Sequence, residues 1–232
     1  MACKFTLPYA GLHCTVSPNG SFVAFVTTGN RLTVRSIDTL EVTNIFQCVD
    51  KIEKVEISPD SEFILCALYS RNVVQVFSMN DKDWKCRINE GVPGIINAFW
   101  TPDSKKVVTE SDFGIQLSLW SLTDSISVIV SLPKPTSTHF SKSTAFSDCG
   151  RFLAVVHRIE LHDQIGVYYI EPQTSSEMSE VSKFRAKSSD VSAVYWVPGG
   201  THIVTMDSPL SFKFCAYTPS GEVRPSRVTV NI

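Results

Sequence analysis

The chain has 232 residues, and 43% of them are hydrophobic, a proportion that supports a packed core. Its 21 basic and 23 acidic residues give a formal net charge of -2, which leaves no positive surplus for binding nucleic acid or an anionic membrane. The seven cysteines are scattered without zinc-ligand spacing, and no segment has the length and apolarity of a membrane span. We therefore expect a cytoplasmic protein with reduced thiols, no bound metal and no cofactor.

A short turn phrase recurs along the chain and marks five repeats. The phrases are Ser17-Pro18-Asn19-Gly20, Ser58-Pro59-Asp60-Ser61, Thr101-Pro102-Asp103-Ser104, Ser147-Asp148-Cys149-Gly150 and Val197-Pro198-Gly199-Gly200. Proline presets the φ angle of a tight turn, and Asn, Asp and Gly tolerate the conformations that follow it. An apolar, β-prone run precedes each phrase and another follows it, as at 55–57 and 63–65, so each phrase predicts a hairpin.

Two further β-prone runs complete each repeat. A third run follows the hairpin in every repeat, at 32–34, 74–77, 117–120, 167–170 and 212–214, and a weaker fourth run closes the unit, as at 42–46 and 126–130. Four short strands per period of roughly 40 to 45 residues are typical of a propeller blade. The sequence predicts an all-β fold with about five four-stranded blades in one partial β-propeller over residues 1–232. The blades are expected at 10–48, 52–90, 94–131, 140–187 and 191–230.

The polar segments fit between or within these blades. Residues 133–138 are expected to form an inter-blade loop, and residues 173–180 a long hairpin loop in the fourth blade. The C-terminal run 228–232 is β-prone and has no charged side chain, which favours an exposed edge. An array of five blades leaves edges unpaired unless it closes, with 3–7 as the only spare strand. We therefore expect the chain to self-associate through these edges or to depend on a partner.

Candidate binding residues lie in the second repeat. Trp84 stands among charged residues in an expected loop, where a large aromatic side chain serves either as a binding anchor or as a cap over the adjacent strand. Arg71 lies at the neighbouring turn and is a second candidate. His157, His162 and Asp163 contain metal-ligand types, but their spacing favours a solvated polar turn over a metal site.

Several stretches resemble a known family. They are 58–71, 74–76, 84–91 and 100–103, followed by 117–122, 150–154 and 194–199. The stretches between 58 and 103 closely resemble the centrosomal and spindle-pole WD-repeat proteins often called the WD-repeat-containing protein eight family, and the likeness continues collinearly through the later stretches. The repeats are degenerate, because only Trp120 keeps the eponymous tryptophan and the aspartate that follows it in the family is absent.

The resemblance implies a function that the residues alone do not give. Family members are about twice as long and are implied to form a seven-bladed ring, so this chain corresponds to an N-terminal half. The implied role is a scaffold that joins a centrosomal coiled-coil protein and supports microtubule anchoring, spindle assembly and cilium assembly.

The residues themselves favour binding over catalysis. The sequence has no nucleophile elbow, no glycine-rich phosphate loop and no zinc-protease helix, so we expect a protein-binding scaffold and no enzyme. Two alternatives stay open. One is a propeller that binds lipid or nucleic acid, and the other is a propeller enzyme whose site is built from scattered loop residues.

Overall fold

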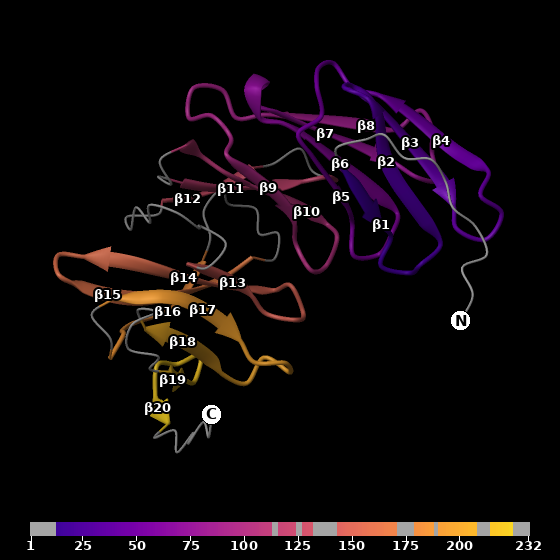
Figure 1. Ribbon diagram of the computed structural model, residues 1–232. Helices are drawn as coiled ribbons and strands as arrows, with labels where there is room; N and C mark the ends of the chain where they lie inside the picture. Colours follow the sequence, from indigo (N-terminus) through magenta and orange to yellow (C-terminus); the bar gives the residue numbers. More distant parts are fainter. Residues whose placement is uncertain are drawn as a thin grey trace. The chain divides into compact units, whose positions relative to one another are not determined.

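A computed structural model describes residues 13–112, 116–123, 127–131, 143–170, 179–187, 190–207 and 214–224. The described residues form five antiparallel four-stranded sheets, each connected as a meander (Figure 1). The helical element whose bounds are described is the short 3-10 turn Tyr69–Arg71. The predicted all-β fold with four-stranded blades is confirmed. The runs at 3–7, 133–138 and 228–232 lie outside the described residues.

The strands follow the repeats along the chain. The first sheet contains β1 (Cys14–Val16), β2 (Phe22–Thr28), β3 (Arg31–Ser36) and β4 (Val42–Gln47), and the second contains β5 (Lys54–Ile57), β6 (Phe63–Leu68), β7 (Val73–Ser78) and β8 (Lys85–Asn89). The third contains β9 (Asn97–Trp100), β10 (Lys106–Glu110), β11 (Gln116–Ser121) and β12 (Ser127–Ser131). The fourth contains β13 (Thr144–Phe146), β14 (Phe152–Ile159), β15 (His162–Tyr169) and β16 (Ser179–Arg185), and the fifth contains β17 (Val191–Trp196), β18 (Ile203–Asp207), β19 (Phe214–Tyr217) and β20 (Val223–Arg224).

The chain divides into two compact units, residues 1–100 and residues 101–232, and the division falls at the turn between β9 and β10. A single partial propeller over the whole chain stays a prediction. Within the fourth sheet, β16 begins at Ser179, so the last two residues of the predicted loop 173–180 are strand, and 173–178 lie outside the described residues.

All five turn phrases fold in the same way. In each, the N–H of the fourth residue donates to the carbonyl of the first, at 2.8 to 3.0 Å, and the fourth residue has positive φ. In the first four, the hydroxyl of the leading Ser or Thr also bonds the third side chain: Asn19 at 2.7 Å, Asp60 at 2.5 Å, Asp103 at 2.6 Å and the Cys149 sulfur at 3.3 Å. The repeated phrase is therefore a repeated hydrogen-bonded turn. The fifth turn lacks the side-chain hydrogen bond, because Val197 has no hydroxyl.

The first unit is held by a core between the first and second sheets. Buried residues of both sheets form one cluster, which includes Leu32 and Ile64. The rings of Phe46 and Phe77 stack across the two sheets with centroids 4.8 Å apart. Trp100 is buried, and its indole N–H donates to the carbonyl of Glu56 in β5 at 3.2 Å. The indole of Trp100 thus links β9 to β5.

The second unit repeats this arrangement between the fourth and fifth sheets. Val156 and Ile203 belong to a shared buried cluster. The indole N–H of Trp196 donates to the Ala145 carbonyl in β13 at 2.9 Å, and its ring lies 6.4 Å from that of Phe152. Trp196 and Trp100 stand at equivalent places in their repeats and make equivalent contacts, so both units use an indole in the same way to link neighbouring sheets.

The prediction of a solvated turn was wrong for two of its three polar residues. β14 and β15 extend until only Glu160 and Leu161 separate them, so His157 and Asp163 lie within the sheet and are buried, while His162 is exposed. The Asp163 carboxylate pairs with Arg158 at 2.7 Å and accepts the N–H of Val191 at 2.6 Å. Strand pairing therefore buries these groups and satisfies Asp163 with a cation and a backbone donor.

Candidate protein-interaction surface

The meander in the second sheet places the two predicted binding residues at opposite ends. Arg71 lies in the turn between β6 and β7, at the end of the sheet where the linkers to the neighbouring sheets also run. Trp84 lies just before β8, at the end that carries the β5–β6 turn phrase. The structure does not bring the two residues together, so a single site cannot contain both.

The Arg71 turn is held by its own backbone and by an ion pair. Asn72 follows the 3-10 turn with φ of 54°, a left-handed conformation that asparagine tolerates, and its N–H donates to the Tyr69 carbonyl at 2.9 Å. The Arg71 Nε atom lies 2.5 Å from the Asp50 carboxylate. The hydrogen bond from Arg71 keeps the pKa of Asp50 below its usual value. Asp50 therefore stays ionised beside the exposed guanidinium.

Side-chain hydrogen bonds fix two linkers beside this turn. The Val49 N–H in the β4–β5 linker donates to Gln75 Oε1 at 2.9 Å, and the Ser70 N–H in the turn donates to the Glu53 carboxylate at 3.2 Å. In the β8–β9 linker, the Ile95 N–H donates to Asn72 Oδ1 at 3.2 Å. Three segments that are distant in the sequence thus lie at one end of the first unit.

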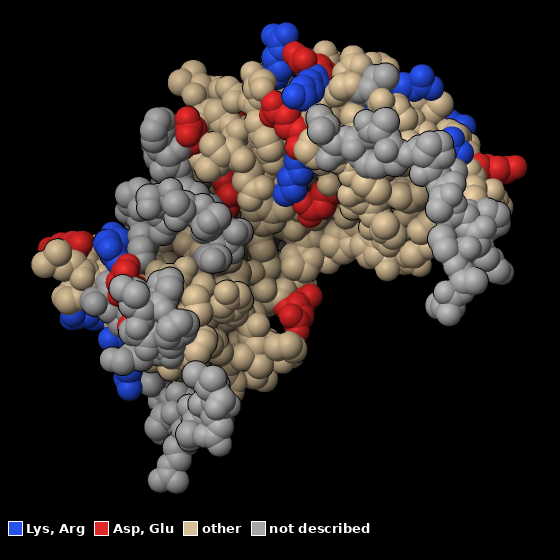
Figure 2. Space-filling view, viewed as in Figure 1, with Lys and Arg blue, Asp and Glu red and all other residues tan. Residues whose placement is uncertain are grey.

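We call this area the linker-end surface and define it by Val49, Asp50, Glu53, Arg71, Val92 and Ile96. Its three aliphatic side chains are exposed, and Val92 is fully so at 103% relative accessibility. Figure 2 shows acidic and basic side chains interspersed over this end of the unit. Exposed aliphatic groups surrounded by charges of both signs resemble the polar rim and apolar centre of protein interfaces.

Trp84 makes a contact that the capping alternative requires. Its side chain is half-buried, and its ring lies 5.0 Å from that of Phe63 at an angle of 57°. Its N–H and carbonyl also close the β7–β8 turn through Asp81 and Ser78. The ring thus covers the neighbouring strand β6, and a role in partner binding stays a prediction.

Sequence reasoning identified Arg71 but missed its neighbours. Val49, Val92 and Ile96 lie in linkers without periodicity, and only the sequence Val92-Pro93-Gly94, a valine in a turn-forming segment, marks one of them. Among the described residues there is no group of three or more His, Cys, Asp or Glu side chains that could hold a metal ion. No helix in the described part of the chain has the length and hydrophobicity needed to cross a membrane.

The fold defines a class of protein: a β-propeller whose blades are WD-repeat-like four-stranded meanders. No protein-family model matches the chain. It is 31% identical over 215 residues to the WD repeat-containing protein WRAP73 of Mus musculus, a match that covers 92% of this chain and 44% of that protein. It is 22% identical over 238 residues to the uncharacterized WD repeat-containing protein C32H8.09 of Schizosaccharomyces pombe, covering 97% of this chain and 48% of that protein.

These similarities support placing the chain among the WD-repeat-containing proteins, and the chain spans about half the length of both relatives. They also support a general role as a protein-interaction scaffold. Neither description refers to a centrosome or a spindle pole, so that part of the expectation stays a proposal. A chain of the Kuenenia stuttgartiensis hydrazine synthase structure is similar with a TM-score of 0.55 and 16% identity, covering 96% of this chain and 67% of that one. At this identity the likeness shows the fold alone.

Proposed function

We propose that the chain is a non-catalytic scaffold that binds a coiled-coil protein through the linker-end surface. The observation that supports this proposal is the fixed group of exposed Val49, Val92 and Ile96 beside the Arg71–Asp50 ion pair. An amphipathic helix presents an apolar stripe flanked by charges, which complements such a surface. Linkers that are pinned by side-chain hydrogen bonds also lose little conformational entropy on binding.

The cellular setting is proposed from family resemblance. The resemblance of the stretch 58–103 to centrosomal WD-repeat proteins, together with the similarity to WRAP73, supports a role at centrosomes and spindle poles. The scaffold would there contribute to microtubule anchoring and to spindle and cilium assembly. Its location would be the cytoplasm of dividing cells, concentrated at the pole.

Affinity purification from dividing cells tests the proposal. The wild-type chain is expected to recover a centrosomal coiled-coil protein, and the double variant Arg71→Glu/Val92→Asp is expected to reduce its recovery by about tenfold, as loss of central interface contacts does. The matched control is Lys85→Glu/Val181→Asp, which makes the same kinds of change at exposed strand positions outside the surface. Equal recovery by both double variants, or retention of the chain on heparin or anionic liposomes in place of a protein, would contradict the proposal.

A further inference from the structure

The outer edge of the first sheet differs from the outer edges of the second and fourth sheets. β4 is the last strand in the sheet order and pairs with β3 on one side only. Such an edge offers unpaired backbone groups to another chain, and proteins usually protect it with charged side chains. β8 carries Lys85 and Arg87, and β16 carries Glu180, Lys183 and Arg185. β4, with the sequence Val-Thr-Asn-Ile-Phe-Gln, has no charge.

The sheet register makes this difference specific. Ile45 in β4 pairs with Thr33, and Arg87 in β8 pairs with Gln75. Thr33 and Gln75 are equivalent, because each lies three residues before the serine that ends its strand. An exposed isoleucine, 51% accessible, therefore occupies the place where the next blade has an arginine.

The orientation of the backbone at this edge follows from one hydrogen bond. The Cys48 N–H, directly after β4, donates to the carbonyl of Asn30, directly before β3, at 2.8 Å. Amide groups along a strand alternate between its two sides. The N–H groups of Gln47 and Ile45 therefore point to the open edge, where an added strand can pair with them.

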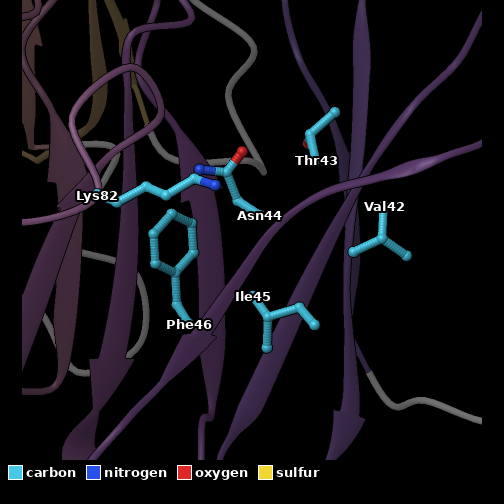
Figure 3. Close-up of a pocket in the computed structure, with 6 residues that line it drawn as sticks. All are labelled: Val42, Thr43, Asn44, Ile45, Phe46 and Lys82. Atoms are coloured by element: carbon cyan, nitrogen blue, oxygen red, sulfur yellow. The ribbon is translucent and has the colours of Figure 1, made fainter.

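A hollow of about 340 Å³ accompanies this edge, lined by Val42, Thr43, Asn44, Ile45, Phe46 and Lys82 (Figure 3). Its floor is fixed, since Phe46 stacks on Phe77 and the Asn44 amide donates to the Met79 carbonyl at 3.2 Å. The β7–β8 turn that carries Lys82 is also fixed, because the Ser78 hydroxyl accepts the N–H groups of Asn80 and Asp81. The hollow is thus built by packed residues of two neighbouring sheets.

Lys82 gives the hollow its charge. Figure 3 shows its side chain extending above the Phe46 ring toward Asn44. No carboxylate within the described part of the chain forms an ion pair with it. A side chain that enters the hollow from an added strand therefore meets an apolar floor and one ammonium group, and the ammonium group favours an acidic side chain.

We propose that β4 is a docking site for an extended peptide segment of a partner protein, which adds to the first sheet as a fifth strand and places an acidic side chain beside Lys82. Main-chain hydrogen bonds to Ile45 and Gln47 supply the attachment, and the hollow selects the side chains. This site is separate from the linker-end surface. The proposal for β4 can therefore be tested independently of the proposed coiled-coil partner.

Fluorescence anisotropy with three synthetic eight-residue peptides tests the proposal. The first alternates valine and threonine around a central glutamate, the second has lysine in place of that glutamate, and the third is the glutamate peptide with alternate amide nitrogens methylated. The full chain is expected to bind the glutamate peptide about threefold more tightly than the lysine peptide. This ratio of dissociation constants corresponds to the free energy of one exposed ion pair. It is expected not to bind the methylated peptide, which lacks the donors for a strand ladder.

Two variants at Ile45 in β4 and one at Lys82 in the β7–β8 turn locate the binding at this edge. Ile45→Arg copies the arginine of β8 and is expected to reduce binding by about tenfold, as charge on an edge strand opposes pairing. Ile45→Pro removes an outward N–H that the β3–β4 ladder does not use and is expected to have the same effect. Lys82→Glu is expected to reverse the preference between the glutamate and lysine peptides, and Val181→Arg in the already charged strand β16 serves as the matched control.

Three results would overturn the proposal. The first is equal binding of the glutamate and lysine peptides by the wild-type chain. The second is binding that survives both Ile45 variants or amide methylation. The third is a wild-type chain that binds no peptide but forms dimers that Ile45→Arg dissociates, since that would assign the edge to a second copy of this chain.

Discussion

At the scale of single residues, burial sets the chemistry of His157. The side chain lies in β14, and its Nε2 atom is 2.8 Å from the Tyr168 hydroxyl. Burial, with a smaller effect from the Lys183 charge, lowers the pKa of His157 to about 4. The folded protein therefore holds this histidine neutral at a pH where the unfolded chain, with an ordinary histidine pKa near 6.5, takes up a proton.

This difference predicts a pH dependence of stability. Between pH of about 6.5 and 4 the unfolded chain binds more protons than the folded chain, so the free energy of unfolding falls as the pH falls through this window. The loss is about 3 kcal/mol, since one pKa unit corresponds to about 1.4 kcal/mol. Urea unfolding at several pH values measures it, and His157→Gln is expected to flatten the dependence while His162→Gln, at an exposed position, leaves it unchanged. An identical pH dependence in wild type and His157→Gln would contradict the assignment.

Trp84 is the residue for which two roles were left open by the sequence. Because its ring packs on Phe63, Trp84→Ala is expected to lower the free energy of unfolding by about 1 kcal/mol, the value of an aromatic pair with modest burial. Partner capture through the linker-end surface should persist, since Trp84 lies at the other end of the second sheet. Parallel measurements of urea unfolding and partner recovery check this. Lost capture with unchanged unfolding would instead identify Trp84 as a binding anchor.

At the scale of elements, an indole hydrogen bond links neighbouring sheets at equivalent places in both units. Trp196→Phe keeps most of the ring but removes the N–H that reaches the Ala145 carbonyl. We expect the free energy of unfolding to fall by about 1 kcal/mol, the usual net value of one hydrogen bond. Tyr195→Phe, which removes an exposed hydroxyl on the adjacent residue, should change stability by less than about 0.5 kcal/mol. Equal effects in chemical denaturation would show that the hydrogen bond does not stabilise the sheet interface.

The elements differ in how far the sequence predicts them. The five turns were predictable because their chemistry is local: each has a fourth residue that adopts positive φ, and the first three also have a hydroxyl with an Asn or Asp two residues later. The linker-end surface was not predictable, because Gln75 and Asn72 fix the linkers from 26 and 23 residues away. The burial of Asp163 was missed for the same reason, since its partner Val191 belongs to the next sheet.

At the scale of the whole molecule, the first and fifth sheets each have one apolar face outside the described sheet-to-sheet cores. In the first sheet, Val16 is 55% and Ile45 is 51% exposed. In the fifth, Tyr195 and Phe214 are exposed. Each of these faces is opposite the one that packs within its own unit. Apolar sheet faces of this kind associate in water when nothing covers them.

We accordingly predict that the isolated chain self-associates. Multi-angle light scattering at tens of micromolar, on the order of concentrations where exposed apolar surface aggregates, is expected to give a mass above that of the monomer. Val16→Lys, which places a charge on the outward face of the first sheet, is expected to lower this mass. A stable monomer for the wild-type chain would show that these faces are covered.

The central claim is that the linker-end surface binds a protein partner, and hydrogen exchange of the chain alone and in complex with its recovered coiled-coil partner tests it most directly. Binding there slows exchange of the backbone amides that the partner covers. We predict slower exchange in residues 48–53, 69–72 and 90–96. Protection confined to the β7–β8 turn, or to residues 101–232, would contradict the claim.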